Sequence, residues 1–239
     1  MSISRYKKPI ILGILFFLPV TFLLFLYPST HNYQSLDIVY DNVEDISPFL
    51  NDKEKEYAFQ NNITVLTFLG EKPYEKAIQA LNLKELIYDK FKGFKRFQVI
   101  ALVANGSENE VKLLLRELYQ YDELKYWHFV YGDADEIQSI YNSLLSTSAL
   151  SHDLSTEEVF IIDKDLKQRG RIDDRTEPEI EKDAKVYGLY SYNCIEVAEL
   201  KNKMSEDMRI LFTEYRQKRK GNYDSSTRRE ENLKGDAKN

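Results

Sequence analysis

The feature that most constrains the fold is a regular alternation of short apolar runs with longer amphipathic segments. Runs rich in Val, Ile, Leu, Phe and Tyr predict strands, and apolar residues at helical spacing predict helices between them. The strands are expected at 63–69, 97–103, 126–131 and 159–162, and the helices at 74–91, 108–119 and 134–145. This alternation is typical of βαβ units and therefore predicts a mostly parallel sheet.

The second half of the chain predicts antiparallel strands instead of parallel ones. A turn follows Asp163, and residues 168–172 are expected to return antiparallel to the strand before them. Residues 194–215 then carry apolar side chains at helical spacing and predict a long closing helix. A late antiparallel hairpin followed by a closing helix is the plan of a thioredoxin-like domain. The expected fold class is therefore α/β, with a thioredoxin-like mixed sheet flanked by helices.

The first thirty residues predict a membrane anchor. Arg5, Lys7 and Lys8 precede an uncharged apolar run over 9–27, and about 20 such residues span a bilayer as a helix. A cleaved signal peptide is the alternative, but its apolar run is usually only about 7–15 residues and ends at a small-x-small site. Basic residues before the span keep residues 1–8 in the cytoplasm. The domain is then expected on the periplasmic, extracytoplasmic side of the cytoplasmic membrane.

Composition limits the remaining organisation and the partners. We expect a linker over 28–40, one domain over 41–216 and a disordered charged tail over 217–239. The net charge of −6, with both signs interspersed, disfavours a nucleic-acid partner because phosphate binding needs a concentrated basic surface. Cys194 is the only cysteine, so the chain cannot form an internal disulfide or a dithiol redox couple.

Residues 68–76, with the sequence Phe-Leu-Gly-Glu-Lys-Pro-Tyr-Glu-Lys, join the first buried strand to the first helix. In a thioredoxin-like domain this junction holds the reactive cysteine pair, which is absent here. We interpret the junction as a degenerate active-site loop formed by Glu71, Lys72, Pro73, Glu75 and Lys76. It is either a solvated first helical turn with Pro73 near N1 or a rim that has become a protein-binding surface.

The other candidate residues are isolated. His152 is interpreted as a loop histidine, and a site made by His31, His128 and His152 would need the fold to bring all three together. Cys194 precedes the predicted closing helix, where a thiol can have a lowered pKa, but a passive buried cysteine is also common. The acidic residues around the hairpin lack the spacing of a calcium loop and are interpreted as solvated turn charges. They are Asp163, Asp165, Asp173, Asp174, Glu177 and Glu179.

Three segments carry a family resemblance. Residues 127–133, Trp-His-Phe-Val-Tyr-Gly-Asp, look like the Trp-x-Phe-x-x-Gly-Asp segment of the SCO/SenC family, and 159–165 resemble the family's strand and Asp-containing turn. Residues 206–215 are similar to the closing helix of Bacteroidetes-type members. The family comprises membrane-anchored thioredoxin-like proteins that bind copper and help to assemble cytochrome c oxidase. The resemblance covers about residues 40–216 plus the anchor, and it implies a bacterial protein.

The chain departs from the family at the copper ligands. The family motif is Cys-Pro-x-x-x-Cys; Pro73 matches it, but Lys72 stands at the first Cys and Lys76 or Ala77 at the second. Ammonium groups cannot replace thiolates as copper ligands. His152 lies about three residues before the position of the family's distal histidine, and Ser155 lies closer to it. The resemblance therefore implies a divergent member that lacks the cysteine pair.

Two functional hypotheses follow. The first is a non-enzymatic protein-binding or assembly factor with no cofactor, no catalytic residue and an unidentified protein partner in the envelope. The second is a copper metallochaperone or redox protein for cytochrome c oxidase assembly whose ligands have moved to Cys194 and His152.

Overall fold

The computed structural model describes residues 4–26, 35–50, 57–119 and 124–219. Contacts divide the chain into two units, Met1–Gln34 and Ser35–Asn239. Each unit is described by itself.

The first unit contains one helix, α1 (Ser4–Leu26), which confirms a helix over most of the uncharged run. Its side chains are described from Ile11 to Phe22, and the large apolar ones among them are exposed. In the described part of the chain, no helix combines the length and the apolar character needed to cross a membrane. The membrane span predicted over 9–27 is therefore not confirmed.

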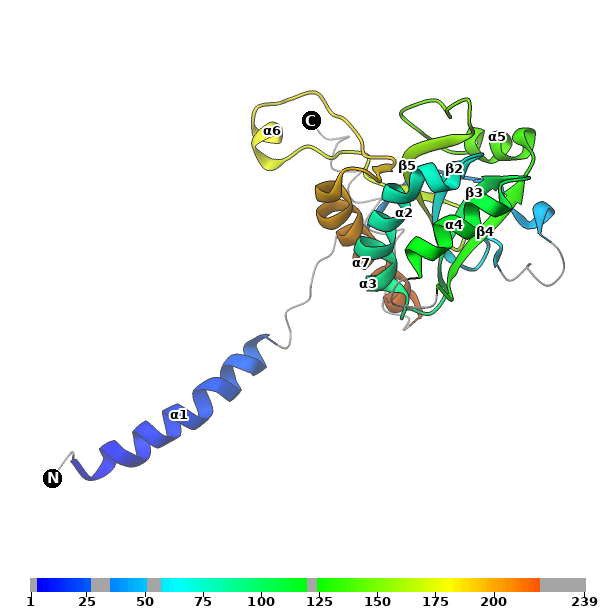
Figure 1. The fold of residues 1–239 in the computed structure, drawn as a ribbon. Coiled ribbons are helices and arrows are strands. Elements are labelled where there is room, and N and C mark those ends of the chain that lie inside the picture. Colours follow the sequence, from blue (N-terminus) through cyan, green and yellow to red (C-terminus); the bar gives the residue numbers. More distant parts are fainter. Residues whose placement is uncertain (1–3, 27–34, 51–56, 120–123, 220–239) are drawn as a thin grey trace. The chain divides into compact units, whose positions relative to one another are not determined.

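The second unit is built on a mixed sheet (Figure 1). Its strands are β1 (Asp37–Tyr40), β2 (Ile63–Gly70), β3 (Phe97–Ala104), β4 (Trp127–Gly132), β5 (Ser155–Ile162), β6 (Gln168–Gly170) and β7 (Tyr192–Asn193). Their order across the described sheet is β1-β6-β5-β2-β3-β4, and β7 pairs with β5. The strands β2, β3 and β4 are parallel, whereas β5, β6 and β1 pair antiparallel. The predicted parallel core with a late antiparallel hairpin is confirmed.

Helical segments alternate with these strands as the sequence predicts. In the second unit they are η1 (Ser47–Phe49), η3 (Pro73–Lys76), α2 (Ala77–Leu83), η4 (Lys84–Tyr88), α3 (Asp89–Phe91), α4 (Glu108–Leu118), α5 (Ala134–Asn142), α6 (Glu177–Glu181), η5 (Glu199–Met204) and α7 (Ser205–Arg219). The single helix predicted over 74–91 is a continuous helical run that opens with a 3₁₀ turn and contains a π-helical turn, η4.

The two faces of the sheet carry separate apolar cores. One face packs against α2 to α3, α4 and α7, with Trp127 and Phe212 in its core. The other face packs against α5 and the η1 segment, with Phe68 and Phe160 in its core. Every residue of β2 and β3 is buried, as expected for central parallel strands covered on both faces. This double burial explains why their sequences are apolar runs without alternation.

The closing helix begins later than predicted. Helical structure begins at Val197, directly before η5, and the side chains of Ile195 and Val197 are exposed instead of lying on a buried helical stripe. The Cys194 backbone N–H donates to the Glu157 carbonyl at 2.8 Å, which continues the pairing of β7 with β5. Because the backbone here still follows the sheet, the helix cannot begin at Cys194. The edge strand β1 also lies within the segment interpreted as linker, while residues 220–239 of the predicted tail lie outside the described residues.

The acidic residues around the hairpin are not all solvated, which corrects the interpretation of the sequence. Asp163 and Asp174 are buried, and both form ion pairs. Arg169, also buried, pairs with Asp163 at 2.8 Å and with Glu214 of α7 at 2.5 Å. Buried charges occur in proteins when they are paired in this way, so these residues attach the closing helix to β6.

Candidate functional site

The turn predicted as a degenerate active site lies at the carboxyl end of β2, the parallel strand between β5 and β3. Gly70 ends β2, and Pro73 opens the 3₁₀ turn η3 that leads directly into α2. In open α/β sheets, ligand sites form outside the carboxyl ends of the parallel strands. The structure therefore places Glu71, Lys72, Pro73, Glu75 and Lys76, hereafter the 71–76 turn, where a thioredoxin-like domain keeps its chemistry.

The 71–76 turn packs closely on the loop that precedes β5. The Glu71 backbone N–H donates to the Asp153 carbonyl at 2.9 Å. Gly70 has a φ of +64°, and a Cβ built on it would lie 1.9 Å from the same carbonyl oxygen. Only glycine combines this conformation with so close an approach. Nothing in the sequence pattern connects Gly70 with Asp153.

The two lysines of the turn each form an ion pair, one within the turn at i,i+3 spacing and one with the loop before β5. Lys72 pairs with Glu75 at 3.1 Å, and Lys76 pairs with Asp153 at 3.2 Å. The hydrogen bond from Lys72 to Glu75 raises the pKa of that lysine. Burial acts to raise the pKa of Asp153, but hydrogen bonds from Ser155 and Lys76 outweigh it, so this pKa is lowered. Lys72 and Lys76 are thus each paired with a carboxylate.

Cys194 and His152, the alternative ligand pair, lie in contrasting surroundings. Cys194 is fully buried, and burial raises the pKa of its thiol, the opposite of the lowered value considered from its predicted place before a helix. His152 is exposed in the loop before β5. No group of three or more His, Cys, Asp or Glu side chains is arranged to hold a metal ion in the described residues.

His128 lies on β4, half-buried, with its ring stacked on Tyr57 at a centroid distance of 3.7 Å. Burial lowers the pKa of His128 to about 4. Its neighbour Trp127 points into the core, as predicted from strand alternation. His31, the third histidine, lies outside the described residues.

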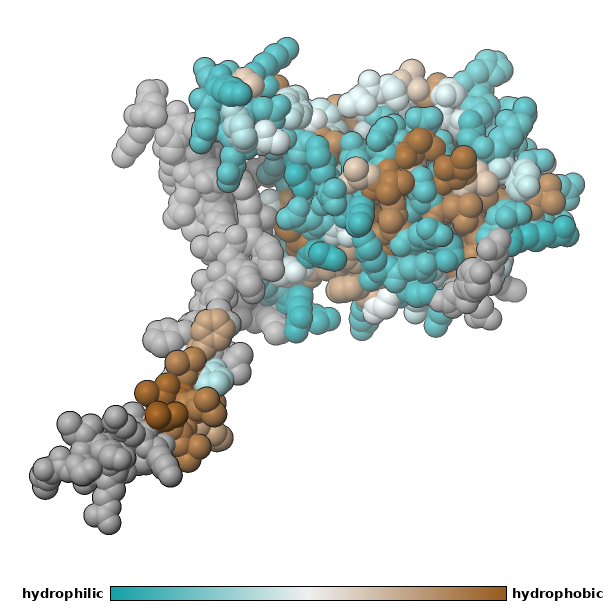
Figure 2. Space-filling model, turned by 60° about the vertical axis from the view of Figure 1, so that its left-hand side comes forward, coloured by the Kyte–Doolittle hydropathy of each residue, from teal (hydrophilic) through white to brown (hydrophobic). Residues whose placement is uncertain are grey.

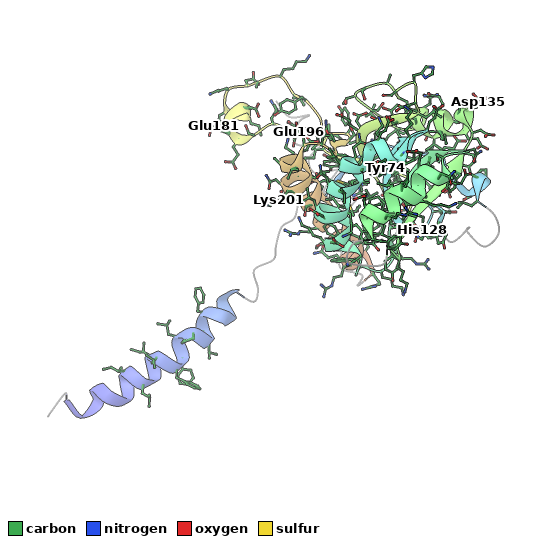
Figure 3. All side chains as sticks on the ribbon, in the orientation of Figure 1. Tyr74, His128, Asp135, Glu181, Glu196 and Lys201 are labelled. Carbon is green, nitrogen blue, oxygen red and sulfur yellow. The ribbon has the colours of Figure 1, made fainter. Side chains whose placement is uncertain are left out.

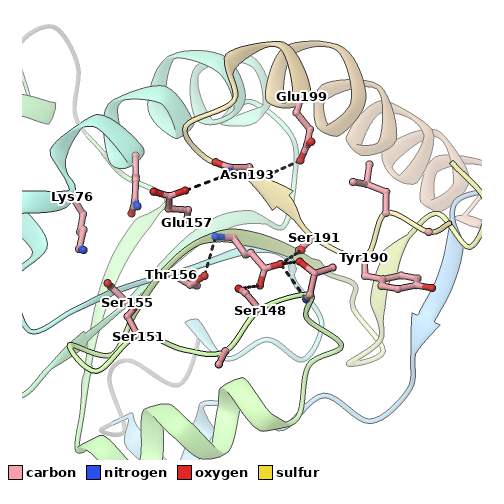
Figure 4. A pocket seen from close by; sticks show the side chains of 16 residues that line it. Lys76, Ser148, Ser151, Ser155, Thr156, Glu157, Tyr190, Ser191, Asn193 and Glu199 are labelled. Carbon is pink, nitrogen blue, oxygen red and sulfur yellow. Dashed lines mark hydrogen bonds between the residues drawn. The ribbon is translucent and has the colours of Figure 1, made fainter. Parts of the chain in front are cut away.

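A polar pocket beside the 71–76 turn was not predicted. Its volume is about 590 Å³, within the range usual for ligand pockets, and Figure 4 shows its lining. Hydroxyl side chains form a large part of this lining. The other polar side chains come from Lys76, Gln79, Glu157, Glu158, Asn193 and Glu199. Those hydroxyl residues are Thr147, Ser148, Ser151, Ser155, Thr156, Tyr190 and Ser191. The density of Ser and Thr over 147–156 was the available sequence signal. We call this cavity the hydroxyl pocket.

Glu158 forms the centre of the pocket's hydrogen-bond network. Its buried carboxylate accepts hydrogen bonds from the hydroxyls of Ser148 at 3.0 Å, Ser191 at 2.7 Å and Tyr141 at 3.1 Å. Both the hydroxyl and the backbone N–H of Thr147 also donate to it. Burial acts to raise the pKa of Glu158, but these donors outweigh it, so this pKa is lowered. The pocket therefore contains an ionised carboxylate.

Exposed apolar side chains flank the 71–76 turn. Tyr74, Ile78, Ile195 and Val197 are between 40 and 66% exposed, and we call these four residues the apolar rim. Asn82 donates to the Cys194 carbonyl at 2.9 Å, and Ile78 lies one helical turn before Asn82 on the same side of α2. This contact brings the two halves of the rim together. Figure 2 shows apolar side chains gathered on one face of the domain, and Figure 3 labels Tyr74.

Comparison with known proteins gives structural neighbours only. No protein-family model matches the chain, and no curated protein does. BsSco, described as a member of the Sco family of cytochrome c oxidase assembly proteins, is 16% identical, with 76% of this chain and 99% of that chain covered and a TM-score of 0.43. The soluble domain of Sco1 from Bacillus subtilis is 15% identical, with coverages of 72% and 92% and a TM-score of 0.38.

A thioredoxin domain of a thiol-disulfide oxidoreductase from Bacteroides vulgatus is also similar, at 15% identity, with coverages of 53% and 82% and a TM-score of 0.31. The strand order and directions of the chain itself establish the fold. This protein has a thioredoxin-like domain that resembles Sco structures and carries a single, buried cysteine.

Proposed function

We propose that the domain is a non-catalytic thioredoxin-like module that binds a protein partner through the 71–76 turn and the apolar rim. The observation that carries the proposal is the exposure of four large apolar side chains around a turn whose lysines are ion-paired. Exposed apolar clusters rimmed by polar residues mark interaction sites. Aromatic and aliphatic anchors of this kind contribute most of the binding energy of protein interfaces.

The same residues argue for a role without redox or copper chemistry. Lys72 and Lys76 offer no thiolate at the turn, and Cys194 is buried with a raised pKa. Its thiol would have to become exposed before it could bind copper together with His152. We therefore propose no enzymatic activity, no cofactor and no nucleic-acid partner for this domain.

The proposed setting comes from the sequence. The uncharged run over 9–27 supports a tether to the cytoplasmic membrane with the domain on its outer side. The sequence resemblance to SCO proteins makes the assembly of an envelope complex, such as cytochrome c oxidase, the place to look for the partner. Extraction of membranes with alkaline carbonate tests the tether: the full chain should stay in the pellet, and its release would contradict it.

The binding role is tested by one pair of matched variants. Ile78→Ser removes an apolar side chain from the rim, and Ile180→Ser makes the same change at an exposed isoleucine of α6. Ile78→Ser should reduce recovery of the partner with the full chain by tenfold or more, which corresponds to about 1.4 kcal/mol. Ile180→Ser should leave recovery unchanged. Equal recovery with both variants would reject the rim as the binding surface.

A further inference from the structure

The hydroxyl pocket is strongly anionic. Glu157, Glu158 and Glu199 line it together with one lysine, Lys76, and that lysine is already paired with Asp153. Within the described part of the chain, none of these three glutamates forms an ion pair. The pocket thus holds three carboxylates whose charge no described cation compensates.

Glu158 is the least expected of the three because it is only 8% exposed. Buried carboxylates are normally paired with a cation, yet the donors to Glu158 are the neutral groups described above. Hydroxyl dipoles stabilise the charge but do not cancel it, and its field is stronger where water is excluded. The network therefore builds a permanent negative charge into the wall of the pocket.

Gln79 supplies a second and independent indication. It lines the pocket and is 5% exposed, and its Oε1 atom has no hydrogen-bond partner in the described residues. An unsatisfied buried acceptor costs about 1–3 kcal/mol, and such groups in native proteins need an explanation. A ligand that brings an N–H donor would satisfy it.

Asn193 positions the other two carboxylates of the pocket, Glu157 and Glu199. Asn193 donates through its side chain to Glu157 at 3.4 Å and through its backbone N–H to Glu199 at 2.7 Å (Figure 4). One oxygen of each glutamate accepts these bonds, and its second oxygen has no hydrogen bond in the described structure. The mouth therefore presents acceptors that are positioned but not saturated.

These features select the class of ligand. Anions are excluded by charge, and the acceptors require a ligand rich in donors. The described carboxylates do not converge into a metal-binding group, which favours an organic cation that can reach several of them over a compact metal ion. A guanidinium group carries five N–H donors and an ammonium group three. The volume of about 590 Å³ is ample for one such side chain.

We propose that the hydroxyl pocket binds an aliphatic ammonium or guanidinium group, donated by an Arg or Lys side chain of the protein that docks on the apolar rim. The source of the cation rests on the proposed function, because the pocket and the rim share the start of α2, with Gln79 in one and Ile78 in the other. The chemistry of the pocket itself does not depend on the proposed function, because a free aliphatic amine has the same N–H donors.

The test measures binding of three probes to the full chain by calorimetry. They are agmatine, acetyl-Ala-Arg-Ala-amide and the same peptide with citrulline in place of Arg, which keeps the shape and removes the charge. The arginine peptide should bind at least tenfold more tightly than the citrulline peptide, and added salt should weaken it. Tighter binding of the peptide than of agmatine supports a protein source, and equal binding supports a free amine. No binding of either cation, or equal binding of arginine and citrulline peptides, would overturn the proposal.

Matched variants locate the binding. Glu199→Gln and Glu157→Gln should each weaken binding of the arginine peptide by about two- to fivefold, the usual range for one exposed charge contact. Gln79→Leu, which keeps the size of the side chain, should also weaken it. The control is Glu196→Gln, the same change at an exposed glutamate outside the pocket (Figure 3). An equal loss in the control would overturn the assignment.

The two proposals fail separately. If the partner is still captured through Ile78 while neither cation binds, the pocket assignment is wrong and the proposed function stands. If the cations bind but capture does not depend on Ile78, the proposed function is wrong and the pocket assignment stands.

Discussion

Gly70 has two constraints at once, a positive φ and contact with the Asp153 carbonyl oxygen. Gly106 has the first without the second: its φ is +94°, and a Cβ added there would meet open space, with no atom beyond its chain neighbours within 4 Å. A comparison of substitutions at the two glycines therefore separates the cost of backbone strain from the cost of steric overlap.

We expect Gly70→Ala to lower the free energy of unfolding by about 2–4 kcal/mol, because strain and overlap both act. Gly106→Ala should cost only the strain, about 1 kcal/mol. Urea unfolding of both variants measures the difference. Equal losses would show that the 71–76 turn does not pack on the loop before β5 as described.

Cys194 should be chemically silent in the folded protein. Its thiol is buried and its pKa is raised, and only the thiolate reacts readily with disulfide reagents. Ellman's reagent at pH 8 should label native protein negligibly and unfolded protein fully. A Cys194→Ala, Ser151→Cys double variant, which moves the thiol to an exposed position beside the turn, should react at once. Rapid labelling of native Cys194 would restore the relocated-ligand hypothesis.

His128 should make stability depend on pH. Its pKa is lowered from 6.5 to about 4 by burial, so the folded state prefers the neutral ring. Stability is complete above about pH 6.5 and falls as the pH drops from 6.5 towards 4, because the unfolded chain binds the proton more readily. The carboxylates with lowered pKa lose their contribution only below their ordinary values of 3.8 for Asp and 4.5 for Glu. They are Asp153, Glu158, Asp173 and Glu179.

Urea unfolding at pH 7.5 and 5 tests this. His128→Phe keeps an aromatic ring to stack on Tyr57 and should flatten the dependence between these two pH values. The same substitution at exposed His152 should leave it intact. A wild-type protein equally stable at both pH values would contradict the prediction.

At the scale of elements, a buried network of ion pairs attaches α7 to the sheet. Arg169 contacts Asp163 and Glu214, and it also donates to the Leu36 carbonyl at 2.7 Å. The network thus joins β6, α7 and the residue just before β1. Removing the arginine leaves Glu214 with Lys218 as its remaining ion-pair partner, at 2.8 Å, and takes the cation away from the buried carboxylate of Asp163.

Arg169→Met should therefore cost about 3–5 kcal/mol, the usual penalty for breaking a buried pair. Lys167→Met, which breaks the exposed pair with Asp41 near the same hairpin, should cost less than about 1 kcal/mol. Denaturant unfolding measures both. A small loss for Arg169→Met would mean that α7 is held by its apolar face alone.

Sequence patterns predicted the elements best where burial is complete. The strands β2 and β3 were predicted within about a residue of their ends because both of their faces are covered and most of their positions are apolar. Prediction failed where tertiary contacts override a pattern. The predicted helix included Cys194 and Ile195, but the hydrogen bond from Cys194 to Glu157 keeps the backbone at Cys194 in the sheet pairing, and the helix begins only at Val197.

At the scale of the whole molecule, the order of elements determined the fold, whereas the candidate site depends on contacts between distant segments. The 71–76 turn could be located from the sequence because it follows a buried strand. The hydroxyl pocket could not, because Gln79, Glu158 and Glu199 come from α2, β5 and η5 and no spacing relates them. The ion-pair partners of Lys76 and Arg169 could not be predicted from the sequence for the same reason.

The central claim is that a thioredoxin-like domain without a cysteine pair uses its former active-site surface to bind a protein. The most direct measurement places a photo-crosslinking amino acid at Tyr74 in the full chain, in intact cells, and another at Asp135 on α5 as the control. Tyr74 should give one discrete adduct that Ile78→Ser abolishes and Ile180→Ser does not, and Asp135 should give none. No adduct at Tyr74, or the same adduct from both positions, would contradict the account.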